Sequence, residues 1–563
     1  MDNNLIADSF SLLAKLTDIH GENSFKAKSY ATAAFTIEKL PLQLNETPHD
    51  KIIGIKGIGD STGKKIIELL TTGSLNALIE MIEKTPPGVM ELLKIKGIGP
   101  KKIATIWKEM EIESVGELLY ACKENRLKLF KGFGEKTQQN ITETIEYYLK
   151  SKGSYLYAQI DLMADEVNGF MMKLFPLKKV EIVGAYKRQV EIIHELELVI
   201  DDSISNIENI FATVSDFELV EKNQNDVLYR ASVGLKIRIY GCDIKPFIQQ
   251  VFFNNCSEVF GEAFAQQFTS IGYAACTNEE AIFEQASLNF IPACQREMAS
   301  IIELSKHNPL PKLLDVADIK GIIHSHSNWS DGNNTIEEMA IAAIEKGFEY
   351  LVISDHSKSA FYANGLQENR IKEQHLYVDE LNKQFAPFKI FKSIESDILN
   401  DGSLDYSNAI LSTFDLVIAS IHSNLKMSED KAMMRLMNAI ENPYTTILGH
   451  MTGRLLLSRK GYPVDHKAII DACAANNVVI ELNAHPSRLD MDWRHIEYAL
   501  SKNVLISIDP DAHSLNGFND IRFGVLVAQK AMVSVENNLS SFGLAAFEAF
   551  LLKKKQTATH FKL

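Results

Sequence analysis

The hydrophobic positions of the first 150 residues follow a helical pattern, in short apolar stretches separated by polar turns. One turn recurs three times with nearly the same letters, as Lys56-Gly57-Ile58-Gly59, Lys96-Gly97-Ile98-Gly99 and Lys131-Gly132-Phe133-Gly134. Each copy follows a short apolar helix and precedes another helix that opens with basic or small polar residues. The repeat therefore predicts a helix, a tight glycine turn and a second helix.

Two further changes of pattern follow along the chain. From about Gly153 to Pro309, alternating strand-like and helix-like segments predict an α+β unit. The turn-forming segment Pro309-Leu310-Pro311 then indicates a domain boundary near Asp315, because turn-forming residues often connect domains. After it, short apolar strands alternate with amphipathic helices such as Ile336–Lys346. We therefore expect three domains, at residues 1–150, 151–314 and 315–563.

Seven predicted strands of the last domain each end in histidine or a carboxylate. They are Gly321–His326, Tyr350–His356, Phe388–Asp397, Asp415–His422, Thr445–His450, Val478–His485 and Val504–His513. Parallel strands that are joined by helices close into a barrel, and side chains at their carboxyl ends converge on one mouth. The pattern therefore predicts a β/α barrel with a cluster of ionisable side chains at its mouth.

Composition sets limits on the class of protein. With 46% hydrophobic and 23% charged residues, the chain has the composition of an ordinary globular protein. Its longest apolar runs, such as Phe542–Phe547, are far shorter than the roughly 18 residues that a membrane span needs. The start Met1-Asp2 is acidic where a signal peptide is basic, and the six cysteines form no CxxC pair. We expect a cytoplasmic protein that binds no membrane and acts as a monomer.

Charges and histidines are unevenly distributed along the chain. The formal net charge is −15, yet residues 1–150 contain 20 basic and 20 acidic side chains, so the acidic excess follows Lys150. This distribution argues against nucleic-acid binding over the whole surface but allows a local DNA-binding region in the first domain. Eleven of the 15 histidines lie from His324 onward, which favours metal binding in the C-terminal half.

The glycine turns have the chemistry of a phosphate-binding site. Glycine permits backbone conformations in which consecutive N–H groups at the start of a helix face a phosphate oxygen. Nearby lysines add charge, so a DNA backbone could be held without reading bases. For a single copy, a simple connection between packed helices is an equal alternative, but three copies with lysines favour DNA binding. The candidate residues are Gly57, Gly59, Lys64, Lys65, Gly97, Gly99, Lys101, Lys102, Gly132 and Gly134.

The strand ends of the last domain supply metal ligands. His324 and His326 are two apart, so on a strand both side chains project to the same face. Together with carboxylates and other histidines they make nine groups, enough for two or three divalent ions. A set of imidazoles and carboxylates without thiolates suits Mn²⁺, Zn²⁺ or Fe²⁺ equally. The candidate ligands are His324, His326, Asp331, His356, Glu395, His422, His450, Asp511 and His513.

Such a centre favours hydrolysis of phosphoesters, because clustered cations activate water and neutralise charge on a phosphoryl group. Arg454 follows the ligand His450 closely and is the candidate catalytic residue, as a clamp on a nonbridging phosphate oxygen. A salt bridge at the barrel rim is an equal alternative for it. Asp355 either orients the imidazole of His356 or caps the following helix.

These motifs resemble those of known families. The glycine turns resemble the helix-hairpin-helix modules of DNA repair proteins. The segments around His324-Ser325-His326, Ser354-Asp355-His356 and Asp511-Ala512-His513 resemble the polymerase-and-histidinol-phosphatase (PHP) domain, with competent residues at all nine ligand positions. That resemblance implies a distorted (β/α)7 barrel with a trinuclear site. The order of parts resembles the bacterial and archaeal family X DNA polymerases over essentially the full length, which implies a nucleotidyltransferase-like palm and thumb in the middle.

The expected palm departs from the pattern of that family, which has a Gly-Ser turn followed by two basic residues, an Asp-x-Asp strand and a third Asp on a neighbouring strand. Here the turn lacks the hydroxyl, the acidic strand reads Glu195-Leu196-Glu197, and Arg238 stands at the third carboxylate. A fixed cation at that position opposes binding of two Mg²⁺ ions. We expect Glu195 and Glu197 to pair with Arg238 instead. The residues of this degenerate site are Gly184, Ala185, Lys187, Arg188, Glu195, Glu197 and Arg238.

The leading hypothesis is a DNA repair enzyme whose barrel hydrolyses phosphoesters at gapped, nicked or 3′ ends, while the hairpins and the palm hold the strand. The family resemblance implies 3′–5′ exonuclease activity. One alternative is a gap-filling polymerase in which Glu195 and Glu197 suffice, and another is a noncatalytic scaffold that binds DNA ends. Lys65 matches the position of a Schiff-base lysine in animal members of the family, although a simple phosphate contact is the favoured interpretation.

Overall fold

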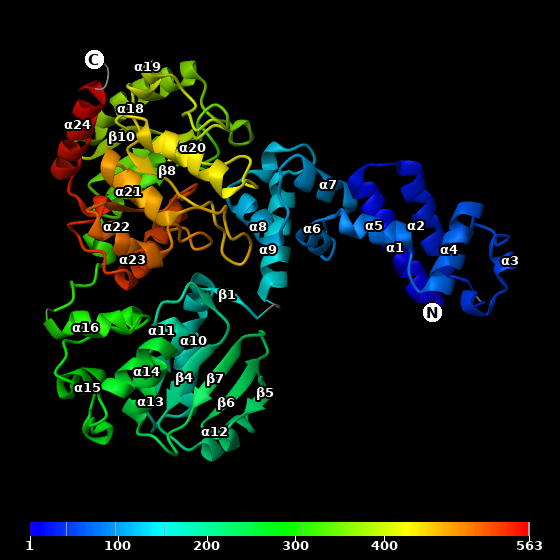
Figure 1. Ribbon diagram of the computed structural model, residues 1–563, viewed down its shortest axis with the longest axis horizontal. Coiled ribbons are helices and arrows are strands. Elements are labelled where there is room, and N and C mark those ends of the chain that lie inside the picture. Colours follow the sequence, from blue (N-terminus) through cyan, green and yellow to red (C-terminus); the bar gives the residue numbers. More distant parts are fainter. Residues whose placement is uncertain (41, 96, 151–152, 308, 561–563) are drawn as a thin grey trace. The chain divides into compact units, whose positions relative to one another are not determined.

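The computed structural model describes residues 1–40, 42–95, 97–150, 153–307 and 309–560 (Figure 1). Lys96, which begins the second glycine turn, lies outside the described residues. The chain forms two compact units, one of Met1–Lys123 with Phe130–Tyr148 and one of Glu124–Leu129 with Leu149–Leu563. Among the helices described, none has the length and apolar character that a bilayer crossing requires.

The first unit is built from helices, as the sequence pattern predicts. Asp2 caps the first helix by accepting a hydrogen bond from the N–H of Leu5, and Gly21 ends it with φ 71°. Ile6 and Phe10, one turn apart, are fully buried. The helices are α1 (Asn3–His20), α2 (Ser24–Glu38), α3 (His49–Ile52), α4 (Asp60–Thr72), α5 (Asn76–Glu83), α6 (Pro87–Leu92), α7 (Pro100–Lys108), α8 (Val115–Lys123) and α9 (Glu135–Lys150).

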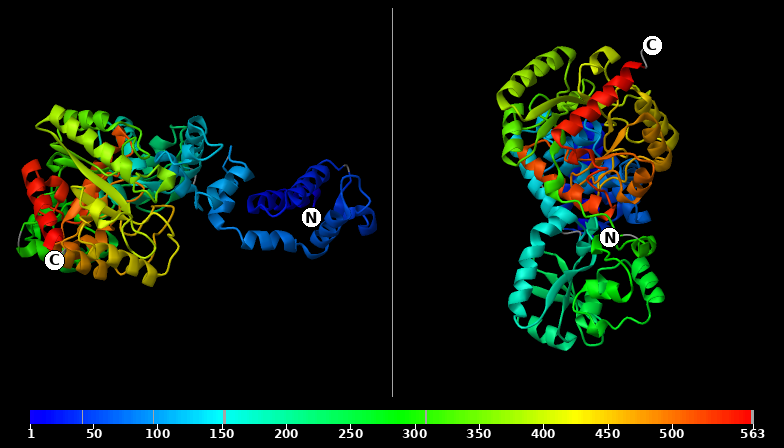
Figure 2. Two further views of the ribbon diagram at one scale, coloured as in Figure 1. Left: turned by 90° about the horizontal axis from the view of Figure 1, so that it is seen from above. Right: turned by 90° about the vertical axis from the view of Figure 1, so that its left-hand side faces the viewer.

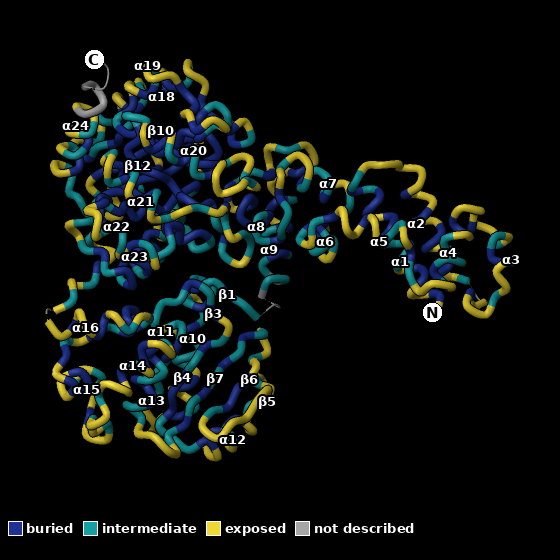
Figure 3. The backbone as a smooth tube through the Cα atoms, in the orientation of Figure 1, coloured by how far each residue is buried: buried dark blue, intermediate teal, exposed yellow. Residues whose placement is uncertain are grey.

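The second unit begins with a mixed sheet in the order β2-β4-β7-β6-β5. Its strands are β2 (Val180–Val183), β4 (Leu196–Ile200), β5 (Phe217–Lys222), β6 (Asp226–Ala231) and β7 (Lys236–Tyr240). Only β4 and β7 pair in parallel. The central strands are largely buried, whereas the edge strand β5 is exposed (Figure 3). The predicted α+β character of this section is confirmed.

Helices cover both faces of this sheet. The helices α10 (Tyr157–Leu174) and α12 (Ile204–Phe211) share one apolar cluster with β4 and β7, and α13 (Phe247–Asn254) packs against Val183 and Val199 in another. The remaining elements of this section are α11 (Gly184–Lys187), α14 (Glu258–Gln267), α15 (Glu279–Gln285), α16 (Ser300–His307) and the antiparallel pair β1 (Tyr155–Leu156) and β3 (Ile192–Ile193).

The rest of the unit is the predicted β/α barrel. Its seven parallel strands are β8 (Gly321–Ser325), β9 (Tyr350–Ile353), β10 (Lys389–Asp397), β11 (Leu416–Ser420), β12 (Ile447–Leu448), β13 (Val479–Asn483) and β14 (Ile506–Asp509). The first and last strands meet just beyond their ends, where the N–H of His326 donates to the carbonyl of Ala512 over 2.8 Å. The barrel is therefore nearly closed.

Helices surround these strands, and the last of them, α24 (Leu544–His560), crosses one end of the barrel (Figure 2). The others are α17 (Ile336–Glu345), α18 (Glu368–Phe385), α19 (Asn408–Leu411), α20 (Glu429–Glu441), α21 (His466–Asn476), α22 (Ile496–Ser501) and α23 (Ile521–Lys530). Thr335 and Glu338 form a capping box at the start of α17, which fixes where that helix begins.

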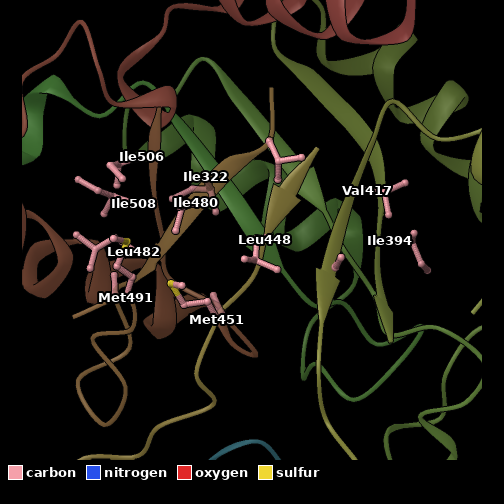
Figure 4. Packing of buried hydrophobic residues seen from close by; sticks show 14 of the residues in the cluster. Ile322, Ile394, Val417, Leu448, Met451, Ile480, Leu482, Met491, Ile506 and Ile508 are labelled. Carbon is pink, nitrogen blue, oxygen red and sulfur yellow. The ribbon is translucent and has the colours of Figure 1, made fainter. Parts of the chain in front are cut away.

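Alternate residues of the strands pack on two sides. Ile322 and Ile480 belong to the large core between strands and helices (Figure 4). Their neighbours Ile323 and Val479 belong to a second cluster, which includes the fully buried Phe547 of α24. Burial of one phenylalanine side chain contributes about 1.5–3 kcal/mol. The C-terminal helix thus helps to hold the strands whose opposite ends carry the candidate metal ligands.

Candidate functional site

All nine predicted metal ligands come together at the carboxyl ends of the barrel strands. His324 and Glu395 lie on β8 and β10, and the other ligands lie in the loops that follow strands. The most exposed side chain among the nine is that of His422, at 9%. The convergence that strand ends predict is therefore present, in a place almost closed to solvent.

Glu395 lies among four imidazoles. Its Oε1 is 3.0 Å from Nε2 of His450, 3.1 Å from Nε2 of His422 and 3.3 Å from Nε2 of His324. Its Oε2 is 2.9 Å from Nδ1 of His356. One carboxylate can therefore serve more than one metal position.

The other two carboxylates complete the cluster. Oδ1 of Asp511 lies 3.1 Å from Nε2 of His326. The two oxygens of Asp331 each lie 3.5 Å from an Nε2 atom, one of His356 and one of His513. The possible ligand atoms form three groups, and within each group the atoms lie within 4.8 Å of one another. The first group is His326, Asp331, His356 and His513, the second is His324, His326 and Asp511, and the third is His356, Glu395 and His422.

The donor atoms of this cluster fit divalent ions. Several are buried without a hydrogen-bond partner among the residues described, which is costly unless something else satisfies them. His356 Nδ1 and Glu395 Oε2 are 2.9 Å apart yet not hydrogen-bonded. Ligands that share one ion at about 2.1 Å stand roughly 3 Å apart. The unpartnered atoms include Nε2 of His324, Nδ1 of His326, Oδ2 of Asp331, Nδ1 of His450 and Nε2 of His513.

Neighbouring charges keep the Glu395 carboxylate ionised. Burial by itself raises the pKa of Glu395, but the imidazoles of His422 and His324 outweigh it and hold that pKa well below its ordinary value. Burial lowers the pKa of His422 and His513, yet nearby carboxylates outweigh it and raise both to about 9. His326 differs, since burial and then the charge of His513 lower its pKa. An ionised carboxylate is the form that binds a metal ion, whereas His422 and His513 must first lose a proton to bind one.

Two of the ligands have an unusual backbone conformation. His324 has φ 56° and Asp511 has φ 52°, in the left-handed region that side chains other than glycine rarely adopt. Such conformations persist only where the surroundings impose them. Here the hydrogen bonds between β8 and the loop after β14, including Ala512 N–H to the carbonyl of His324, impose them. Closure of the barrel therefore positions both ligands.

Two acidic residues that the sequence reasoning did not assign as ligand partners orient the imidazoles. Glu481 on β13 lies 2.5 Å from Nδ1 of His324 and accepts the N–H of His450 over 3.1 Å. Asp397 lies 2.6 Å from Nδ1 of His422. Partners of this kind set the tautomer and direction of a ligand ring. For Glu481, the available signal was an acidic side chain between two apolar residues of a strand, and for Asp397 it was a place at the end of a strand.

Asp355 has neither of the two roles left open for it. Its carboxylate accepts hydrogen bonds from the N–H and hydroxyl of Ser327, the hydroxyl of Ser330 and the amide of Gln374. These contacts fix the loop that carries His326 and Asp331. Asp355 therefore positions ligands through the backbone of a neighbouring loop, which local sequence does not reveal.

Arg454 has the rim salt bridge, the second of its two alternatives. Its Nη1 donates to Asp492 over 2.6 Å, its Nε to the carbonyl of Arg488 over 3.0 Å, and its Nη2 to the carbonyl of Leu489. These contacts hold the guanidinium against the loop of residues 488–492. A cation that the sequence reasoning missed lies nearer the ligands, since Nε of Arg488 is 3.7 Å from Oδ2 of Asp511.

The three glycine turns share one geometry. The first glycines Gly57, Gly97 and Gly132 have φ of 94°, 87° and 93°. The second glycines Gly59 and Gly99 are the N-caps of α4 and α7, and Gly134 directly precedes α9. All six glycines are exposed, while the residue between each pair is buried and anchors the turn. The lysines Lys64, Lys65, Lys101 and Lys102 on the following helices are exposed or half-buried. The helix starts are thus open to a phosphate.

In the middle sheet, a guanidinium neutralises the acidic residues. Arg238 on β7 stands opposite Glu197 of β4 in the strand register. Its guanidinium nevertheless contacts Glu195 through two hydrogen bonds of 2.5 and 3.2 Å, and Asp226 through one of 2.5 Å. The hydrogen bonds with Glu195, and then the bond with Asp226, raise the pKa of Arg238 above its ordinary value. The expected pairing with Glu195 is present.

Glu197 does not join this network, which corrects the expectation for it. One oxygen of Glu197 accepts the N–H of Ala185 and the other accepts the hydroxyl of Tyr240, both over 2.9 Å. Gly184 has φ 76°, and a Cβ there would lie 1.9 Å from that first oxygen. The turn is therefore shaped around the Glu197 carboxylate, which accepts the N–H of Ala185.

The two basic residues after this turn have separate surroundings. Arg188 pairs with Glu297 over 3.3 Å and donates to the carbonyl of Asn254 over 3.0 Å. Lys187 lines a cavity of about 270 Å³ together with Tyr157 and Tyr186.

The fold and these sites define a class of protein, one that joins helix-hairpin-helix DNA-binding modules to a PHP-type metal-dependent phosphoesterase barrel. Family models agree with this description. Residues 1–75 match the helix-hairpin-helix domain, residues 89–146 the SAM-like helix-hairpin-helix tandem, and residues 323–485 the PHP domain.

Whole-chain similarity narrows the class to one family. The DNA polymerase/3'-5' exonuclease PolX of Bacillus subtilis (strain 168) is 30% identical to this chain over 96% of the chain and 97% of that relative. The probable phosphatase TTE1963 of Caldanaerobacter subterraneus subsp. tengcongensis is 30% identical over 28% of this chain and 60% of its own length. The probable phosphatase YcdX of Escherichia coli O81 (strain ED1a) is 27% identical over 29% and 62%. The chain belongs to the family X DNA polymerases that carry a C-terminal PHP domain.

Neutralising Glu395 should empty the metal centre. We expect Glu395→Gln to weaken metal binding by about 10–100-fold or more, because four imidazoles lose their shared carboxylate. Metal content by mass spectrometry and the thermal midpoint with and without chelator measure this. The control is His307→Ala, because the His307 side chain is 73% exposed and lies outside the metal cluster. Equal metal content in Glu395→Gln and the parent chain would contradict the assignment.

Truncating Arg238 should loosen the middle sheet. We expect Arg238→Ala to lower the opening free energy of β4 and β7 by about 1–3 kcal/mol, because two half-buried carboxylates lose their cation. Amide hydrogen exchange of these strands gives the value. Arg230→Ala is the matched control, since Arg230 and its partner Glu218 are 46% and 72% exposed and their pair is worth at most about 1 kcal/mol. Similar losses in both variants would count against the network.

Proposed function

We propose that this chain is a cytoplasmic DNA repair enzyme that acts as a monomer and removes nucleotides from the 3′ ends of gapped or nicked DNA at the mouth of its barrel. The observation that carries the proposal is the set of imidazole and carboxylate groups at the mouth of the barrel, almost closed to solvent, several of which have unpartnered donor atoms. The printed name of the Bacillus subtilis relative, which includes a 3'-5' exonuclease, supports the direction of cleavage.

Two or three divalent ions, Mn²⁺ or Zn²⁺ in the first place and Fe²⁺ in the second, would supply Lewis-acid activation of water and neutralisation of phosphate charge. In hydrolysis, water adds to phosphorus, the P–O3′ bond breaks, and the leaving 3′ oxygen takes up a proton. The chain's own part is to hold nine ligands in place. Glu481 and Asp397 orient imidazoles, and Asp355 holds the loop with His326 and Asp331.

We further propose that the palm positions DNA and has little or no nucleotidyl transfer. Polymerisation there would require Arg238 to release Glu195 and Glu197 to release Ala185, before Mg²⁺ and a nucleotide could enter. Both carboxylates are already satisfied by fixed partners, so this exchange is unfavourable. A gap-filling polymerase, which the name of the same relative includes, is the second candidate.

A gel assay tests the barrel and the palm together. On a 5′-labelled gapped primer-template with Mn²⁺, we expect the primer to shorten and not to extend when dNTPs are added. His326→Ala should abolish shortening, because it removes a ligand from two of the metal groups. Glu195→Ala should leave shortening unchanged.

If the parent chain extends the primer and Glu195→Ala does not, the result would instead establish polymerase activity. Absence of both reactions in the metal-loaded chain, with DNA binding intact, would favour a noncatalytic scaffold.

The glycine turns should supply DNA affinity without sequence preference. We expect Lys101→Glu with Lys102→Glu to weaken binding of gapped DNA and to reduce the salt dependence of the affinity by about one to two phosphate contacts. Lys15→Glu with Lys28→Glu makes the same charge change at exposed positions of α1 and α2. Fluorescence anisotropy across salt concentrations compares the two. Equal weakening by both pairs would assign the effect to net charge rather than to the turns.

A further inference from the structure

The loop after β9 brings a tyrosine side chain to the metal centre. Tyr362 lies in the short helix η6 (Phe361–Ala363), six residues after the ligand His356. The centres of the Tyr362 and His356 rings are 6.4 Å apart. The hydroxyl oxygen of Tyr362 is buried and has no hydrogen-bond partner among the residues described. The adjacent Phe361 is 78% exposed, so the loop turns its polar aromatic residue inward and its apolar one outward.

The loop is tied to the ligand strands at both ends, so this placement is fixed by its neighbours. The N–H of Ser357 donates to the carbonyl of Glu395 over 3.0 Å, and the N–H of Leu366 donates to the carbonyl of His356 over 2.9 Å. Gly365 packs so closely that a Cβ there would lie 1.9 Å from the carbonyl oxygen of Ser357. The tyrosine is therefore held against the centre rather than free to turn away from it.

A buried hydroxyl without a partner is unfavourable unless a ligand supplies one. Charged groups of both signs surround this hydroxyl. They are the carboxylates of Asp397, Glu395 and Asp331 and the guanidinium of Arg126, whose central carbon lies 4.2 Å from the centre of the Tyr362 ring. A phenol donates one hydrogen bond through its O–H group, and this one lacks an acceptor among the residues described. The acceptor that the proposed reaction brings to this place is a phosphate oxygen.

We propose that Tyr362 is a substrate-contacting residue that donates a hydrogen bond to one nonbridging oxygen of the phosphate under attack. The inference rests on the proposed nuclease function and adds a residue to it. Negative charge grows on the nonbridging oxygens during hydrolysis, so the hydrogen bond strengthens toward the transition state. No proton is transferred, and Tyr362 keeps its hydrogen throughout.

The test uses the full chain loaded with Mn²⁺ and compares Tyr362→Phe with Tyr377→Phe, which removes a hydroxyl from the half-buried Tyr377 on α18. We expect Tyr362→Phe to lower kcat for removal of the 3′ nucleotide by about 10–100-fold, with KM within about threefold. Metal content and thermal midpoint should match the parent chain. Tyr377→Phe should leave kcat unchanged.

A stereochemical readout separates a contact from a structural role. In a phosphorothioate substrate, sulfur replaces one nonbridging oxygen of the phosphate. In the parent chain, we expect slower cleavage of the isomer in which sulfur replaces the oxygen that accepts the hydrogen bond. The difference in rate between the two isomers should be smaller in Tyr362→Phe.

Unchanged kcat in Tyr362→Phe would overturn the inference about Tyr362. A fall in kcat that is explained by lost metal or lost stability would overturn it as well. Neither result would contradict the proposed nuclease function. A parent chain no more active than His326→Ala would overturn the proposed function itself.

Discussion

The structure depends on how it compensates carboxylates that it has removed from water. Glu395 has no exposed surface, and four imidazole nitrogens lie 2.9–3.3 Å from its oxygens. A buried carboxylate is tolerable only with partners of this kind. The strand ends must therefore meet at one point, and barrel closure, loop anchors and the strained backbone of His324 all serve that requirement.

The same constraint has a different solution in the middle sheet. There, the Arg238 guanidinium donates to Glu195, and the N–H of Ala185 and the hydroxyl of Tyr240 donate to Glu197. A guanidinium stays charged and uses its donors in a fixed plane, so it does not give way to a metal ion. An imidazole can lose its proton and offer a lone pair to the metal. This difference explains why one acidic cluster suits metals and the other suits a stable fold.

Support for the barrel centre extends well beyond its ligands. Glu481 and Asp397 direct imidazoles, and Asp355 ties the β8 loop to α18 through Gln374. On the far side of the strands, Tyr350 stacks on Phe547 of α24, with ring centres 4.4 Å apart. A residue distant from the site can thus affect it, because each ligand is only as well placed as the strand and loop that carry it.

Sequence alone determined the elements and the set of candidate ligands. Periodicity separates helices from strands, and carboxyl ends of parallel strands must converge, so the nine ligands and the glycine turns could be read directly. Apart from the pairing of Arg238 with Glu195, the partners of the polar groups at the two sites were decided by the tertiary structure. Asp355 reaches a neighbouring loop, Glu197 reaches the turn at Ala185 rather than Arg238, and Tyr362 faces the ligands. These outcomes depend on distances between segments remote in sequence, and a local pattern carries no information about such distances.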